Sequence, residues 1–217
     1  MELAIYDLDR TLTRRATYTP FLIHCALRRA PWRLLLLPLV LLSVLAYALK
    51  IIDRGRLKEI NHRLLLGRWI HPKDLKPLVD SFADATVTGN IRPGGRKAIA
   101  RDKSEGRRLV LATASYRLYA DAIAERLGFD DVIGTGSVIG LDERIRSRIA
   151  GENAYGEAKL RMIAEWVEKS GLTGRHGRSP PCRVTASGST GVTSGFTSVV
   201  MDPSLPADPR VTTATPQ

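Results

Sequence analysis

The stretch LAIYDLDRTLTRR, residues 3–15, places two carboxylates and a threonine hydroxyl directly after a run of apolar residues. Residues 3–6 are bounded by polar side chains, which predicts a short buried strand. Asp7, Asp9 and Thr11 then lie at its carboxyl end, where open α/β sheets place their ligand sites. Two carboxylates this close repel each other unless a cation or a shared proton compensates them. The stretch therefore predicts a charged site at the end of the first strand.

The composition is ordinary for a globular protein with one core, or with one core and a small inserted domain. The chain has 217 residues, of which 44% are hydrophobic and 25% are charged. Its two cysteines, Cys25 and Cys182, exclude a disulfide framework and lack the spacing of metal ligands. No basic leader with an apolar stretch and a cleavage site precedes the first strand, so we expect a cytoplasmic location.

The net charge of +11 comes from one segment of the chain. Residues 10–76 hold fourteen lysines or arginines against three acids, and the rest of the chain is balanced. Such a segment can face phosphate groups of a substrate, anionic lipid headgroups or nucleic acid, or it can be a solvated surface. No basic motif with interleaved aromatic residues is recognisable, so we expect no nucleic-acid partner.

The pattern of helices and strands changes at about residue 87. Before it, helices are predicted over residues 18–29, 34–52, 56–66 and 74–86. After it, the patterns predict helices over 96–105, 116–127 and 156–168, strands over 107–115 and 130–135, and a β-hairpin over 140–151. Strands that alternate with helices predict a parallel sheet and an α/β fold.

Two later stretches carry further candidate site residues. LVLATAS ends a predicted buried strand in small hydroxyl residues, so Thr113 and the backbone amides of Ala114 and Ser115 can bind an anionic oxygen. GENAYGEAKLRMIAEW places Lys159 near the first turn of an amphipathic helix. A single lysine at such a position is more often a solvated charge, so each stretch alone is a weak signal.

Taken together, the three stretches resemble the motifs of the haloacid dehalogenase superfamily, in particular its phosphoserine-phosphatase-like subgroup (subfamily IB type). DLDRTLT resembles the DxDxT first motif, LATAS the strand that ends in Ser or Thr, and GENAYGEAK the approach to the motif lysine. The resemblance covers about residues 3–169 and implies a Rossmann-like parallel sheet with helices on both faces. The helical insertion resembles the cap that covers the active site in such enzymes.

The domain boundaries follow from this resemblance. We expect an α/β phosphatase core over residues 1–14 and 87–173 and an inserted helical cap, with an apolar helix, over residues 15–86. An irregular tail is expected over residues 174–217.

The resemblance implies a Mg²⁺-dependent phosphomonoester hydrolase that acts through an aspartyl-phosphate intermediate. Asp7 is the implied nucleophile, and Asp9 is the implied acid that protonates the leaving oxygen and later activates water. Mg²⁺ is expected on the Asp7 carboxylate and the Asp9 backbone carbonyl. Thr11 is expected to hold the loop, Thr113 to bind a phosphoryl oxygen, and Lys159 to balance the charge on the nucleophile and the transferring group.

One position departs from the phosphoserine phosphatases of this subgroup. They carry a glutamate five positions after the motif threonine, where this chain has Ala16. We therefore expect a substrate other than phosphoserine. The basic and apolar cap fits a small or lipid-like phosphomonoester.

The last residues depart further from the superfamily. More than half of residues 174–217 are Gly, Ser, Thr or Pro, without helix or strand periodicity, and the acidic pair of the fourth motif is not recognisable. Asp202 and Asp208 are the acids of this segment. A shift of reading frame near residue 173 explains these losses together, whereas an evolved disordered tail explains the composition alone. Resequencing the coding DNA and translating the other two frames distinguishes them.

The stretch WRLLLLPLVLLSVLAYAL raises the question of membrane contact. Its apolar run between Arg33 and Lys50 has about sixteen residues, fewer than the roughly twenty that span a bilayer. A span would also separate Asp7 from Lys159. Two alternatives stay open: a helix packed within the cap, or a surface over residues 28–58 that lies on the inner face of the membrane. The alternative function is a catalytically impaired, non-enzymatic membrane-surface or binding protein, which the absence of Mg²⁺-dependent turnover would distinguish.

Overall fold

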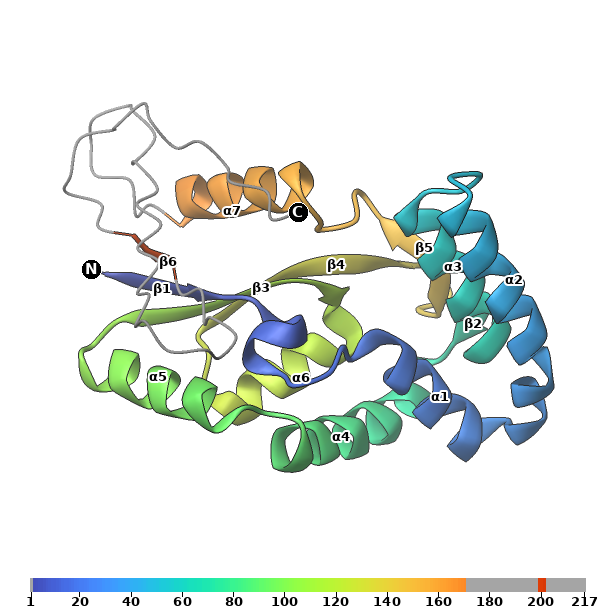
Figure 1. Cartoon of the computed structure of the whole chain (residues 1–217), viewed down its shortest axis with the longest axis horizontal. Coiled ribbons are helices and arrows are strands. Elements are labelled where there is room, and N and C mark those ends of the chain that lie inside the picture. Colours follow the sequence, from blue (N-terminus) through green and yellow to red (C-terminus); the bar gives the residue numbers. More distant parts are fainter. Residues whose placement is uncertain (1, 171–198, 202–217) are drawn as a thin grey trace.

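The structure is a computed structural model that describes residues 2–170 and 199–201. It contains a six-stranded sheet with helices on both faces (Figure 1), which confirms the predicted α/β fold. The strands are β1 (Leu3–Tyr6), β2 (Trp69–Ile70), β3 (Arg108–Tyr116), β4 (Asp131–Ile139), β5 (Ile145–Ala150) and β6 (Val199–Met201). Their order is β2-β5-β4-β3-β1-β6. β1, β3 and β4 are parallel, and the other pairs are antiparallel.

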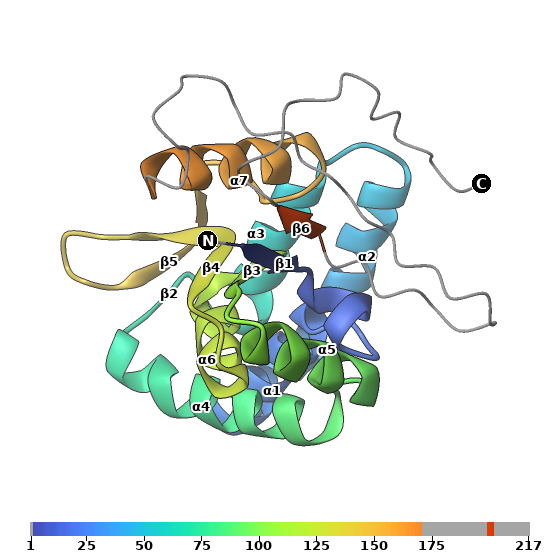
Figure 2. The same cartoon turned by 90° about the vertical axis from the view of Figure 1, so that its left-hand side faces the viewer.

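The helices form a layer on each side of this sheet. They are η1 (Leu8–Leu12), α1 (Tyr18–Arg29), η2 (Pro31–Leu36), α2 (Leu37–Ala48), α3 (Arg54–Leu65), α4 (Pro72–Gly89), α5 (Pro93–Ser104), α6 (Arg117–Leu127) and α7 (Glu157–Lys169). Figure 2 shows α7 on one face of the sheet and α5 and α6 on the other. In this three-layer arrangement the helices cover the two faces of the sheet and not the carboxyl ends of β1 and β3. Loops that follow these strand ends can form a site there.

Alternating side chains of β1 place the core on both faces of the sheet. Leu3 and Ile5 belong to a buried cluster with Ile163 and Val167 of α7. Tyr6 faces the other way, into the larger cluster that includes side chains of α5 and α6. Because a strand alternates its side chains between two faces, a fully apolar strand fits a sheet that is covered on both sides. The structure thus accounts for the apolar run of residues 3–6.

The helices before residue 87 lie in two places. α1, α2 and α3 gather beyond the end of the sheet where β2 and β5 pair (Figure 1). α4 lies below the sheet and packs against α6 as well as α1. The range predicted as a cap, residues 15–86, therefore includes most of α4, which contacts α6 of the α/β core.

Four segments differ from the sequence predictions. The β-hairpin predicted over residues 140–151 is wrong, because this range contributes only the strand β5, which pairs with β4 across a turn at residues 140–144. The helix predicted over 34–52 is a 3₁₀ turn followed by α2, which ends at Ala48 because Lys50 adopts a left-handed backbone with φ of 58°. β2 was not predicted, because two residues are too short for a recognisable alternation. β6 lies in the segment that was expected to be irregular throughout, so that expectation is wrong for residues 199–201.

The direction of β6 matters for the missing fourth motif. It runs antiparallel to β1 with Met201 opposite Leu3, so its carboxyl end lies beside the amino end of β1. The charged residues predicted for the site lie at the opposite end of β1. β6 therefore does not have the direction that would carry following carboxylates to this site. Asp202, Asp208 and the rest of the predicted tail and frame shift lie outside the described residues.

Candidate active site

The loop after β1 turns sharply and is held by its own hydrogen bonds. Arg10 has a left-handed backbone with φ of 63°, a conformation that costs a non-glycine residue about 1 kcal/mol. Its amide donates to the Thr13 hydroxyl at 3.1 Å, and that hydroxyl donates to the Leu8 carbonyl at 3.0 Å. This buried threonine therefore fixes the turn that follows Asp7.

Asp7 and Lys159 meet as the sequence predicts. The Lys159 ammonium donates to one Asp7 carboxylate oxygen at 2.9 Å, and the Thr11 hydroxyl lies 3.5 Å from the other. The Asp7 side chain is 39% exposed, so one edge of the carboxylate remains open to a ligand. The predicted role of Thr11 in the loop fits this weak contact, because the hydroxyl points back to the strand end.

A glycine sets the position of Lys159. Gly156 has φ of 58° and ψ of −130°, a conformation open essentially to glycine, and it directly precedes α7. Ile163 and Val167 of α7 pack on the sheet, which orients the helix so that Lys159, in its first turn, reaches the end of β1. The pair joins residues that are 152 positions apart in the chain.

The Asp9 carboxylate lies among a set of hydroxyl groups. Its carboxylate accepts hydrogen bonds from the Thr17 amide at 2.8 Å, the Thr17 hydroxyl at 2.7 Å and the Ser115 hydroxyl at 2.7 Å. The Tyr119 hydroxyl lies 3.1 Å from the Thr17 hydroxyl. Three donors satisfy an ionised carboxylate, and the two hydroxyls can rotate to accept a hydrogen bond from the neutral acid. These contacts fix the Asp9 side chain beside the carboxyl end of β3.

Thr113 and the end of β3 lie beside this set of hydroxyls. The Thr113 side chain is fully buried, and its hydroxyl oxygen accepts the Ser115 amide at 3.0 Å. The Ser115 amide predicted to bind an anion is therefore already used within the chain, and the Ser115 hydroxyl reaches Asp9 instead. Gly134 allows this close packing, because a Cβ there would lie 3.2 Å from the Ser115 carbonyl oxygen.

Lys58 is a site residue that sequence patterns do not single out. Its side chain is buried, and its ammonium donates to the Ala114 carbonyl oxygen and to the Asn153 side-chain oxygen at 2.6 Å. Burial, reinforced by nearby Arg54, lowers the pKa of Lys58 to about 8, although the charge of Asp9 acts in the opposite direction. Lys58 thus ties α3 to the loop after β3.

We expect Lys58 to give the protein a pH-dependent stability. Between about pH 8 and its ordinary value of 10.5 the unfolded chain holds a proton on Lys58 that the folded chain has lost, so stability rises with pH. We compare the free energy of unfolding of the native protein with that of the Lys58→Gln variant. The difference, native minus variant, should increase by about 2 kcal/mol between about pH 7 and about pH 9.5. Denaturant titrations measure this difference. The difference in free energy of unfolding between the native protein and a Lys97→Gln variant, which loses an exposed lysine but keeps Lys58, should stay constant over the same pH range. A gap between native protein and Lys58→Gln that is the same at both pH values would contradict the expectation.

The donor set at the strand end is compatible with Mg²⁺ bound largely through water and substrate. Within the described residues no cluster of three or more His, Cys, Asp or Glu side chains could hold a metal ion. Asp7 offers a half-exposed carboxylate and Asp9 a backbone carbonyl, which are the oxygen ligands that Mg²⁺ prefers. Mg²⁺ commonly keeps several waters and binds one or two carboxylates together with a phosphate oxygen. These two ligands fit that pattern.

Comparisons with known proteins show the family to which this chain belongs. The family model for haloacid dehalogenase-like hydrolases matches residues 4–179. A protein of unknown function from Bordetella pertussis Tohama I is 20% identical, with a TM-score of 0.65 over 78% of this chain and 75% of that chain. A HAD family hydrolase from Salmonella enterica subsp. enterica serovar Typhi is 11% identical, with a TM-score of 0.55 over 76% of this chain and 50% of that chain.

A substrate-bound phosphoserine phosphatase also has a similar structure. It is 13% identical, with a TM-score of 0.51 over 77% of this chain and 70% of that chain. No curated protein sequence matches this chain. At these identities the solved structures show a shared fold.

Proposed function

Because the chain belongs to the haloacid dehalogenase-like hydrolase family, we propose that it hydrolyses phosphomonoesters through an aspartyl-phosphate on Asp7. The observation that carries the proposal is the pairing of Asp7 with Lys159 at the end of β1, next to an Asp9 held by three hydrogen-bond donors. The nucleophile, a cation and an acid–base group are the parts that a two-step phosphoryl transfer needs.

The first step transfers the phosphoryl group to the protein. The Asp7 carboxylate attacks phosphorus, the bond from phosphorus to the ester oxygen breaks, and Asp9 supplies a proton to the leaving alcohol. Lys159 balances the negative charge on the attacking carboxylate and on the transferring group. Thr113 is the proposed donor to a phosphoryl oxygen, because its hydroxyl accepts the Ser115 amide and keeps its own proton.

The second step releases phosphate. Asp9, now ionised, takes a proton from water as the water oxygen attacks phosphorus, and the bond between phosphorus and the Asp7 carboxylate breaks. The hydroxyls of Thr17 and Ser115 stabilise Asp9 in its charged form between the two steps, and the proton taken from water prepares Asp9 to donate again. The products are the alcohol, inorganic phosphate and an unmodified Asp7.

Mg²⁺ is the proposed cofactor, and its removal is a direct test of the activity. When bound at the Asp7 carboxylate and the Asp9 carbonyl, it would neutralise charge on the phosphate. We expect p-nitrophenyl phosphate hydrolysis in Mg²⁺, measured as nitrophenolate release. EDTA should remove at least about 90% of it, and added Mg²⁺ should restore it. Turnover that is the same in EDTA would contradict the proposed cofactor.

The proposed substrate class is a small or lipid-like phosphomonoester other than phosphoserine. Ala16 offers no carboxylate to a substrate amino group. Among the described residues, the segment after it contributes an apolar helix and many basic residues, which suit a phosphate attached to an apolar group.

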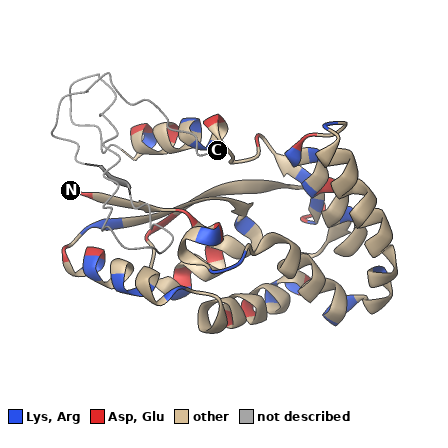
Figure 3. Cartoon of the chain, in the orientation of Figure 1, with Lys and Arg blue, Asp and Glu red and all other residues tan. Residues whose placement is uncertain are grey.

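We propose further that the protein sits at the inner face of a membrane through α2. By length and composition alone the helical segment Pro31–Ala48 passes for a membrane span, although its uninterrupted apolar run is shorter than a typical span, and only 11% of the segment is buried inside the protein. Leu35, Leu41 and Leu49 are 81%, 70% and 63% exposed. Figure 3 shows no charged residue along α2. An exposed apolar patch of this kind favours a lipid surface over the alternative of a helix packed within the cap.

Vesicle sedimentation tests this location. We expect the protein to sediment with vesicles that contain phosphatidylglycerol, and the Leu41→Asp/Leu45→Asp variant to lose most of this binding, because both leucines are exposed on α2. Leu141→Asp is the matched control, since Leu141 is an exposed leucine in the turn between β4 and β5. Added salt should weaken binding by screening basic residues such as Arg28 and Lys50. Equal sedimentation of both variants and the native protein would contradict the proposed surface.

A further inference from the structure

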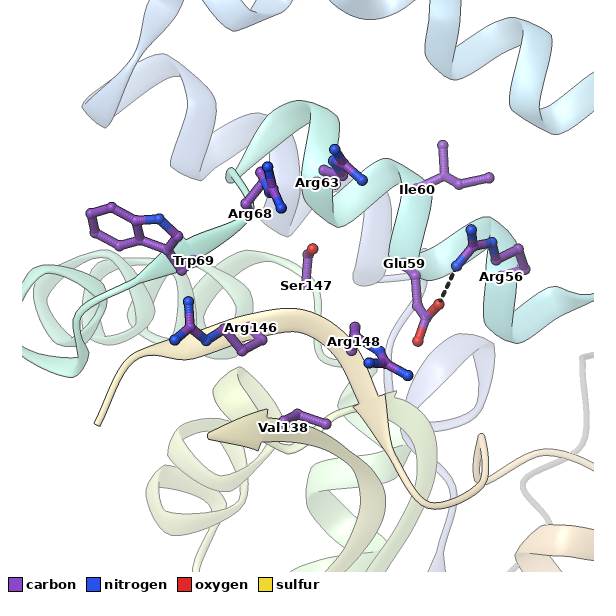
Figure 4. A pocket seen from close by; sticks show the side chains of 10 residues that line it. All are labelled: Arg56, Glu59, Ile60, Arg63, Arg68, Trp69, Val138, Arg146, Ser147 and Arg148. Atoms are coloured by element: carbon purple, nitrogen blue, oxygen red, sulfur yellow. Dashed lines mark hydrogen bonds and ion pairs between the residues drawn. The ribbon is translucent and has the colours of Figure 1, made fainter. Parts of the chain in front are cut away.

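A cavity of about 560 Å³ lies between α3 and the β4–β5 hairpin, apart from the residues proposed for catalysis. Its walls are built by two segments that are distant in sequence: α3 with the start of β2 on one side, and β5 with Val138 of β4 on the other. Figure 4 shows these side chains around the cavity, with Ser147 between the two arginine-bearing walls. The lining residues are Arg56, Glu59, Ile60, Arg63, Arg68, Trp69, Val138, Arg146, Ser147 and Arg148.

The charges of this cavity are strongly unbalanced. It is lined by five arginines and one carboxylate, Glu59. Both oxygens of Glu59 are already used, because one accepts the Ile149 amide at 2.9 Å and the other pairs with Arg56 at 3.1 Å. One guanidinium nitrogen of Arg146 donates to both carboxylate oxygens of Asp142, each at 2.8 Å. These contacts neutralise two of the five arginines.

Three guanidinium groups remain without an acidic partner among the residues that the structure describes. They belong to Arg63, Arg68 and Arg148, and the first two lie on the wall opposite the third. All three side chains are exposed, so water and salt screen their mutual repulsion, and an anion that enters the cavity is attracted by several of them at once. The planar fork of a guanidinium donates two parallel hydrogen bonds to a phosphate group. The Ser147 hydroxyl adds a further donor to the cavity.

The side chains that line the cavity limit the class of anion. Its only aromatic residue is Trp69, and the Arg144 guanidinium lies 3.7 Å from the centre of that ring. A stacking platform for a chain of nucleic-acid bases is therefore not provided by this wall. Three unpaired cations on two walls suit a compact ligand with several linked negative charges rather than a single phosphate. We propose that this cavity is a second anion site, which binds a molecule with two or more linked phosphoryl groups.

The site is separate from the catalytic residues but joined to them through α3. Arg56, Glu59, Ile60 and Arg63 lie on the face of this helix that lines the cavity. Lys58 lies on its buried face and reaches the Ala114 carbonyl oxygen, one residue before the Ser115 that contacts Asp9. Binding at the cavity does not require the proposed chemistry, so it can be tested without turnover.

Isothermal titration calorimetry of the full chain with sodium tripolyphosphate, in EDTA and low salt, tests the proposal. The Arg63→Gln/Arg148→Gln variant should bind about tenfold or more weakly, because each lost guanidinium removes charge-assisted hydrogen bonds. Lys73→Gln/Lys97→Gln removes the same charge from two exposed lysines outside the cavity, and it should bind as the native protein does. Equal binding by both variants would overturn the proposal.

Two further arms identify where and what the protein binds. The Lys159→Ala variant should still bind tripolyphosphate. If Lys159→Ala loses binding while Arg63→Gln/Arg148→Gln keeps it, the anion binds at the catalytic site instead, and the proposal is overturned. A short-chain, water-soluble phosphatidate carries one phosphoryl group and represents a lipid headgroup. It should bind more weakly than tripolyphosphate, and tighter binding that depends on Arg63 and Arg148 would overturn the assignment to a polyphosphate.

Discussion

Asp7→Asn is expected to lower phosphatase activity by about a thousandfold or more, to the limit of detection, while the fold is kept. The change removes the attacking carboxylate and is nearly isosteric. It also removes an ion pair with Lys159, but both side chains are partly exposed, so the pair contributes no more than about 1 kcal/mol to stability. Hydrolysis of p-nitrophenyl phosphate and thermal unfolding measure the two effects separately.

The control for Asp7→Asn is the same substitution at an exposed aspartate far from the site. Asp74 lies in the first turn of α4, and Asp74→Asn should keep the native rate. An Asp7→Asn protein that is folded and as active as Asp74→Asn would remove Asp7 from the reaction.

Lys159→Ala has the second largest expected effect, a fall in kcat of about a hundredfold or more. The ammonium lies 2.9 Å from the Asp7 carboxylate, where negative charge is redistributed as the phosphoryl group moves. Removing it leaves that charge uncompensated in the transition state. Steady-state kinetics at saturating substrate measure the effect on kcat.

Lys169→Ala is a matched control on the same helix. Lys169 ends α7, is 81% exposed and lies 3.9 Å from Glu165. We expect its loss to leave kcat unchanged. Equal kcat values for Lys159→Ala and Lys169→Ala would show that Lys159 is a solvated lysine with no role in the reaction.

Sequence patterns predicted the fold class and the family because both depend on local signals that agree. The apolar strand before Asp7, the small residues at Thr113 and the glycine before α7 each fix a local conformation. The parallel sheet then brings the ends of β1 and β3 together without further information. The matching family model confirms the superfamily that these motifs indicated.

The partners of Asp9 were not predictable from such patterns. Thr17 and Ser115 carry hydroxyls of a type found on every protein surface, and only the placement of the start of α1 and the end of β3 beside the β1 loop brings them to this carboxylate. Lys58 lies in a helix among other basic residues, so its burial depends on how α3 docks. The roles assigned to Asp7, Asp9, Thr11, Thr113 and Lys159 stay predictions until their variants are measured.

The exposed apolar face of α2 and the arginine-lined cavity were also not predictable from sequence patterns, because both depend on how the elements pack. The sequence showed an excess of positive charge over residues 10–76, but not which arginines would find acidic partners. Pairing of β5 with β2 and β4 adds Arg146 and Arg148 to the wall opposite α3. The charge density of the cavity is therefore a property of the tertiary structure.

Detection of the phosphorylated protein tests the central proposal most directly. The protein is mixed with substrate and Mg²⁺, quenched in acid and digested with trypsin, and the peptide that ends at Arg10 is analysed by fragmentation in a mass spectrometer. We expect the mass of one phosphoryl group on Asp7, and none on the same peptide from Asp7→Asn. Turnover with no phosphorylated peptide at any quench time, or with the phosphoryl group on another residue, would contradict the central proposal.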